Sequence, residues 1–110
     1  MSNEQEKYYD LAQRLDDVFS EIDSDTCVDL RRKDSEYDAL KKEHGNLADK
    51  YPFIEKMTDG AAPNSLNTEE IAALTRYLVV DHAMISFELR ALYYRGHADC
   101  LAYLKRINAI

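Results

Sequence analysis

The strongest constraint on the fold is a largely apolar seam in the last forty residues, which contain no proline. Its members recur at intervals of three and four residues, as residues on one face of an α-helix do. The seam consists of Ile71, Leu74, Leu78, His82, Ile85, Leu89, Leu92, Gly96, Cys100, Tyr103 and Ile107, with Ile110 at its end. A helix of about 40 residues is about 60 Å long and needs a second helix beside it.

A local capping pattern marks the start of this helix. Asn67 stands at the N-cap position and Glu70 follows three residues later, so each side chain can accept a hydrogen bond from the other's backbone N–H. Leu66 and Ile71 occupy the positions of a hydrophobic staple across the same turn. The pattern predicts a helix over about residues 68–108.

A second seam runs through the first half of the chain. It begins with Tyr8, Leu11, Leu15, Val18 and Ile22. After an irregular stretch at residues 23–29 it resumes with Leu30, Lys33, Tyr37, Leu40, His44, Leu47, Tyr51 and Ile54. The irregular stretch is either a change of seam phase within one helix or a break at which Ser24 or Thr26 caps a new one. We favour continuity and expect a helix over about residues 4–50.

Residues 51–66 are expected to connect the two helices. Pro52 disfavours helical geometry at Tyr51, so the first helix should end there, and a separate short turn should follow over residues 52–57. Only three glycines and two prolines occur in 110 residues, which also favours helix. We therefore predict an all-α fold in which residues 1–110 form a single helical domain, an antiparallel hairpin of two long helices.

Apolar residues outside the two seams predict self-association. Two paired helices bury one seam each, which leaves other apolar side chains to be covered, namely Phe19, Phe53, Tyr77, Val80, Phe87 and Tyr93. We expect a homodimer with four long helices. Its candidate interface on the second long helix consists of Leu78, His82, Ile85, Leu89, Leu92, Gly96, Cys100 and Tyr103. Gly96 lies on this seam, and we expect another helix to cross closely there.

The net charge of −7 is concentrated near the N-terminus. Residues 1–30 hold nine acids and two bases, whereas residues 31–110 hold twelve of each. An acidic segment argues against direct nucleic-acid binding, which depends on Lys and Arg at the phosphates. The segment is either a solvated helix face or a docking surface for a basic protein. The candidate partner-binding residues are Asp16, Asp17, Glu21 and Asp23, and Tyr93, Arg95 and His97 in the second helix.

The sequence contains no recognisable motif for catalysis, a metal or a cofactor. None of the three histidines follows an acidic residue by three positions, and no HExxH or CxxC occurs. Cys27 and Cys100 lie far apart, so no disulfide framework is expected. We predict no catalytic residue, no metal ligand and no cofactor. A metal or small-ligand site formed by His82, His97 and Cys100 at a dimer axis is the least favoured alternative.

The expected location is the cytoplasm. No run approaches the roughly 18 to 20 apolar residues of a membrane span, and the first residues, MSNEQEKYYD, lack the basic start and apolar stretch of a signal peptide. We expect no membrane partner.

The C-terminal half resembles a group of small uncharacterised helical proteins from Firmicutes, often encoded near mobile elements. The similarity rests on the segments 51–56 (YPFIEK), 93–99 (YYRGHAD) and 102–107 (AYLKRI), and it covers about residues 50–110. The resemblance implies a helical fold and a bacterial, cytoplasmic origin. That group has no assigned activity, so the resemblance implies no catalytic residue.

These observations favour a non-enzymatic helical protein–protein interaction or oligomerisation module. The expected partners are a second copy of the chain and an unidentified protein. The first alternative is an acidic regulator or decoy that occupies the basic surface of a nucleic-acid-binding protein. The second is the metal or small-ligand binder described above.

Overall fold

The computed structural model describes the backbone of residues 3–110 and the side chains of residues 13–110. This part of the chain is all helical, as the sequence predicts. It contains α1 (Asn3–Lys33), α2 (Ser35–Lys50), α3 (Phe53–Thr58) and α4 (Thr68–Arg106). Two members of the first seam, Tyr8 and Leu11, lie outside the described side chains.

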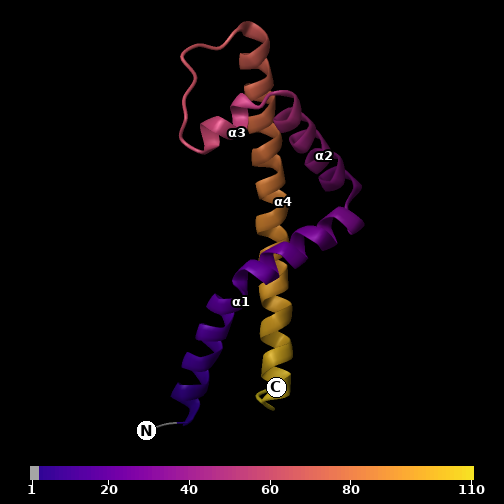
Figure 1. Cartoon of the computed structure of the whole chain (residues 1–110). Helices are drawn as coiled ribbons and strands as arrows, with labels where there is room; N and C mark the ends of the chain where they lie inside the picture. Colours follow the sequence, from indigo (N-terminus) through magenta and orange to yellow (C-terminus); the bar gives the residue numbers. More distant parts are fainter. Residues whose placement is uncertain (1–2) are drawn as a thin grey trace.

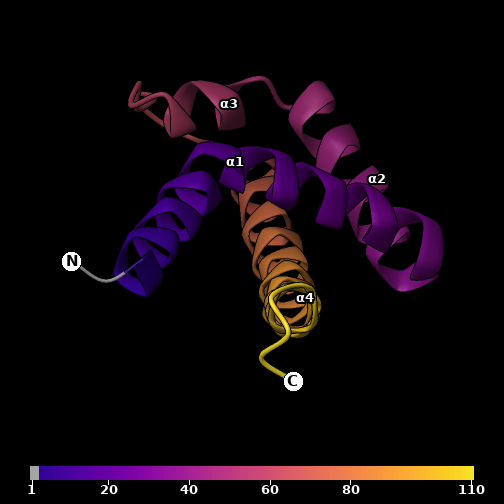
Figure 2. The same cartoon turned by 90° about the horizontal axis from the view of Figure 1, so that it is seen from below.

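The helices form an elongated, open hairpin around α4. The described molecule measures 63 × 31 × 16 Å, and its length is set by α4 (Figure 1). Helices α1 and α2 run in the direction opposite to α4, α1 crossing its lower half obliquely and α2 packing along its upper half (Figure 1). Seen along α4, the other three helices form an arc over one side of it and leave the opposite side uncovered (Figure 2).

The first arm of the hairpin is two helices, which corrects the expectation of one helix over residues 4–50. Residues 23–29 are helical, as favoured, and the Thr26 hydroxyl donates to the carbonyl of Ile22 within α1. The break falls at Asp34, whose backbone is extended at φ −121° and ψ 106°. The Asp34 carboxylate accepts hydrogen bonds from the backbone N–H groups of Glu36 and Tyr37, so it caps α2 and turns the chain.

Helix α4 begins as the capping pattern predicts. Asn67 accepts from the backbone N–H of Glu70 at 2.8 Å, and the Glu70 carboxylate accepts from the backbone N–H of Asn67 at 3.1 Å. Thr68 is the first helical residue and Arg106 the last, two residues before the expected end at 108. Asn108 then adopts a positive φ of 61°, a conformation that asparagine tolerates at helix ends.

The main core lies between α2 and α4. Tyr37 and Val80 are fully buried and Met84 is 4% exposed. The Tyr37 and Phe87 rings pack with their centroids 6.0 Å apart. Leu30 and Leu40 lie against the same cluster. At the other end of α2, Ile54 of α3 is 1% exposed and Ala73 of α4 is 7% exposed.

Where α4 packs against α2 and α3, its inner face is not the face that the seam predicted. The buried positions Ala73, Val80 and Met84 lie two residues from seam positions, which is about 200° around a helix. Val80, Phe87, Tyr77 and Phe53 were expected to be uncovered, yet each is at least partly buried. The wrong face was assigned because α4 is apolar on more than one side, so periodicity alone did not identify the inner one.

Candidate functional site

Most of the upper half of the α4 seam lies open on the surface, and only its member Leu74 is partly buried. Ile71 is 53% exposed, Leu78 56%, Ile85 41% and Leu89 62%. These four side chains and the exposed His82 recur at helical spacing, so they lie along one face of α4. Large apolar side chains gathered along one helix face mark an interaction surface more often than a solvated one.

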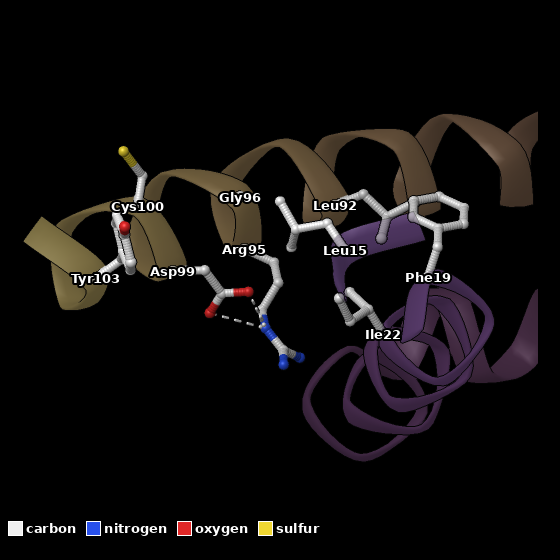
Figure 3. Close-up of a pocket in the computed structure, with 9 residues that line it drawn as sticks. All are labelled: Leu15, Phe19, Ile22, Leu92, Arg95, Gly96, Asp99, Cys100 and Tyr103. Atoms are coloured by element: carbon white, nitrogen blue, oxygen red, sulfur yellow. Dashed lines mark hydrogen bonds and ion pairs between the residues drawn. The ribbon is translucent and has the colours of Figure 1, made fainter. Parts of the chain in front are cut away.

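The lower half of the same seam forms one wall of a groove, which we name the α1/α4 groove. The groove has a volume of about 390 Å³, and its lining is almost wholly apolar. It is lined by Leu15, Phe19 and Ile22 of α1 and by Leu92, Arg95, Gly96, Asp99, Cys100 and Tyr103 of α4 (Figure 3). It exists because the first half of α1 diverges from α4 below the point where the two helices cross (Figure 1).

Gly96 lies on the wall of the groove with open space before it. A Cβ atom built on Gly96 would meet nothing within 4 Å. The expected close crossing of another helix at this glycine is therefore wrong for the described part of a single chain. Phe19, on the opposite wall, is 57% exposed, so the groove is open to an incoming side chain.

Polar groups lie at the edge of the groove. Arg95 Nε donates to both carboxylate oxygens of Asp99, at 3.1 and 3.3 Å, so this pair neutralises itself within α4. The exposed Tyr93 packs edge-on against His97 with ring centroids 4.5 Å apart. The Cys100 thiol points away from the α1 residues (Figure 3). Tyr93, Arg95 and His97 were grouped as partner-binding residues, and the structure places Arg95 apart from the other two, against α1.

A partly buried hydrogen bond joins α2 to α4. The Tyr37 hydroxyl donates to Glu88 Oε2 at 2.5 Å. Burial and the Glu88 carboxylate both raise the pKa of Tyr37 far above its ordinary value. Cys27 of α1 lies beside this pair, and burial is the main cause that raises the pKa of its thiol. The three groups hold the crossing point of α1, α2 and α4 together.

Two further polar contacts fix α2 along α4. Arg76 pairs with Glu43 through both guanidinium donors, one of them at 2.7 Å, and this guanidinium holds the pKa of Glu43 below its ordinary value. His44 Nε2 lies 3.0 Å from Asp81 Oδ1, and its ring stacks on Tyr77 with centroids 4.3 Å apart. These contacts were not predicted, because a single sequence does not show which polar residues on two separate helices face each other.

The acidic residues singled out in the first arm lie along the lower half of α1. Asp16, Asp17 and Glu21 are exposed, and Asp23 is partly buried. Gln13 donates to Asp17 at 3.1 Å. From residue 15 to residue 30, α1 carries six acids and no base, so its outer surface is strongly negative.

His82, His97 and Cys100 are not gathered in one place. All three are exposed on α4, and His82 and His97 are about 22 Å apart along the helix axis, at 1.5 Å per residue. His82 lines a shallow hollow with Leu78 and Val79. Among residues 13–110, no group of three or more His, Cys, Asp or Glu side chains is arranged to hold a metal ion.

The comparisons with known proteins identify a family whose function is unknown. No curated protein and no solved structure matches the chain. None of the described helices combines the length and the hydropathy of a membrane span. A family model described as a family of unknown function, DUF6664, matches residues 6–110, which is nearly the whole sequence. The chain therefore belongs to the DUF6664 family.

Proposed function

We propose that this protein is a non-enzymatic helical interaction module that works by binding a second copy of itself through α4. The observation that carries the proposal is the exposed seam, in which Ile71, Leu78, Ile85 and Leu89 are each at least 41% exposed. Their burial against another molecule is favourable by about 25 cal/mol for each Å² removed from water.

The polar residues inside the hairpin support a structural role. Tyr37 bonds to Glu88, Glu43 pairs with Arg76 and His44 lies against Asp81, and each of these contacts joins α2 to α4. Side chains of this kind can carry catalysis when they are free and converge on a cleft. In this chain they hold two helices in register and so present the outer face of α4 at a fixed angle.

Sedimentation analysis across the micromolar range tests the proposal. We expect a dimer with a fitted dissociation constant in or below that range. Replacing both Leu78 and Leu89 with aspartate should give a monomer that keeps its helical circular dichroism, because neither side chain belongs to the core. A wild-type protein that stays monomeric at several hundred micromolar would refute self-association.

A second candidate function follows from the acidic surface of α1. Asp16, Asp17 and Glu21 are exposed on a stretch without a base, and such a surface suits a regulator or decoy that covers the basic face of a nucleic-acid-binding protein. The test is to replace Asp16, Asp17, Glu21 and Asp23 with lysine and measure capture of basic host proteins at several salt concentrations. This role would be excluded if capture stays the same when the salt concentration rises and when the four acids are replaced with lysine.

A further inference from the structure

The spacing of the seam residues along α4 is the same from either end of the seam. From Ile71 to Tyr103 the steps between successive members are 3, 4, 4, 3, 4, 3, 4, 4 and 3 residues. Two copies of α4 laid antiparallel about Phe87 therefore set every seam residue opposite another seam residue. The reciprocal pairs are Ile71 with Tyr103, Leu74 with Cys100, Leu78 with Gly96, His82 with Leu92, and Ile85 with Leu89.

The pairing keeps its register along the whole interface. The mean step of the seam is about 3.6 residues, which equals the turn of a straight α-helix, so the seam does not drift around α4. An isologous dimer needs one surface that is complementary to itself under a two-fold rotation. The symmetric seam meets this condition, and it identifies the occupant of the face as a second copy of the chain.

The side-chain sizes fit the antiparallel direction. Leu78 projects from the upper half of the seam with 56% of its surface exposed. Its counterpart in the second copy is Gly96, in front of which nothing lies within 4 Å. Leu15 and Phe19 form the opposite wall of the α1/α4 groove, so they flank the position of the incoming leucine. A parallel pairing would instead set glycine against glycine and leave this space empty.

We infer that the protein forms an antiparallel dimer of α4 helices about a two-fold axis that crosses the seam level with Phe87, in which Leu78 of each copy fills the α1/α4 groove of the other over Gly96. The inference rests on the proposed function, and it adds the direction, the register and the residues of the contact. Gly96 is then the position that lets two α4 helices approach closely, at the cost in helix propensity that a glycine carries.

Disulfide trapping tests the register. The background is the full chain with Cys27→Ser, in which Cys100 is the single native thiol. Adding Leu74→Cys places the new thiol opposite Cys100 of the second copy, within the range of a disulfide. Mild oxidation should then link the two chains, with peptide mapping joining position 74 to position 100. The matched control is Ala72→Cys, whose side chain points about 200° around α4 from that of Leu74, and it should not link to Cys100.

The background protein by itself tests the direction. In the antiparallel dimer the two native Cys100 residues are about 39 Å apart along the axis, because each lies 13 residues from Phe87. They should not cross-link. Rapid linkage of Cys100 to Cys100 would overturn the inference in favour of a parallel pair, and so would linkage of the Ala72→Cys protein as efficient as that of the Leu74→Cys protein.

A pair of glycine variants tests the contact at Gly96. Gly96 and Gly45 are both exposed helical glycines, and an added Cβ atom meets nothing within 4 Å at either site in a single chain. Gly96→Leu fills the space that Leu78 of the second copy needs and should raise the dimer dissociation constant about tenfold or more. Gly45→Leu should change it by less than about twofold. Equal effects of the two variants would overturn the contact.

Sedimentation of the wild-type protein tests whether a dimer forms at all, and the variants test whether it forms through this interface. A monomer at all concentrations rejects the proposed function and the inference together. If a dimer forms but Gly96→Leu does not weaken it and Leu74→Cys gives no disulfide with Cys100, the proposed function stands and this interface is rejected. A dimer that responds to both changes supports the antiparallel register.

Discussion

At the scale of single residues, Tyr37 decides how the hairpin closes. It is fully buried among Val80, Met84 and Phe87, and its hydroxyl donates to Glu88. The residue thus joins an apolar core to a charge-assisted hydrogen bond across two helices. Sequence periodicity placed Tyr37 on the seam of the first arm, and the structure confirms that it faces inward. The partner Glu88 was not predicted, because nothing local marks it.

The raised pKa of Tyr37 predicts a stability that depends on alkaline pH. The folded pKa lies above the ordinary value of about 10, so the stabilisation is complete below pH 10 and is lost as pH rises above it. Tyr37→Phe should flatten this decline and lower the unfolding free energy at neutral pH by about 1.5 kcal/mol. Urea unfolding between pH 8 and about 11.5 measures both effects.

The control for this measurement is Tyr93→Phe, since Tyr93 is 66% exposed. It should leave the alkaline slope as it is in the wild type. Part of the slope that remains in Tyr37→Phe belongs to Tyr77, whose pKa is also raised by burial. An unchanged slope in Tyr37→Phe would contradict the assignment.

At the scale of elements, Asp34 explains why the first arm is two helices. The residue has a carboxylate that accepts from two backbone N–H groups of the next turn, which a helical conformation at that position would not allow. The stretch at 23–29 has more conspicuous irregularities, yet it stays helical. Asp34 can either continue the helix or adopt an extended conformation and cap the next one. The seam pattern did not show which of these two conformations is more stable.

Asp34→Ala tests the cap. It should destabilise the chain by about 1 kcal/mol while the helical circular dichroism stays the same or rises, because alanine favours fusion of α1 with α2. Asp34→Asn keeps an acceptor at the cap and should recover most of the loss. Thermal unfolding of the three proteins checks this, and the idea fails if the two variants are equally destabilised.

Helix α4 has two apolar faces with different roles. Substitutions at two adjacent residues, one on each face, can distinguish these roles. Met84 is 4% exposed in the core, whereas Ile85 is 41% exposed on the seam. Met84→Ala should lower the unfolding free energy of the monomer by about 2 kcal/mol or more. Ile85→Ala should have a small effect on the monomer and weaken self-association. Urea unfolding at low concentration and sedimentation at high concentration distinguish the two, and similar monomer losses would contradict two separate faces.

At the scale of the whole molecule, the chain is more extended than a compact domain of its length. Its radius of gyration is 19.6 Å, against about 13 Å for a globular chain of 110 residues. Among residues 13–110, the buried apolar residues are Tyr37, Ile54, Ala73, Val80 and Met84. A core of this size gives limited stability, so association should contribute a large share of the total.

The melting temperature should therefore rise with protein concentration. We expect an increase of several degrees between about 2 and 200 μM, because the dimer binds the folded chain and not the unfolded one. Circular dichroism melts in cells of different path length check this. The Leu78→Asp, Leu89→Asp double variant is the control and should melt at one temperature over the same range. The same concentration dependence of the melting temperature in both proteins would contradict coupling of folding to association.

The sequence by itself determined that the chain is helical, where α4 begins and where the turn before it lies. These features depend on interactions within a few residues, such as the Asn67–Glu70 capping box and the restriction that Pro52 imposes on Tyr51. Only the tertiary structure decided which side of α4 faces inward and that α1 diverges from it to leave a groove. Both α4 faces are apolar at helical spacing, and the choice between them depends on side chains of α2, such as Tyr37 and His44, that meet α4 across more than thirty intervening residues.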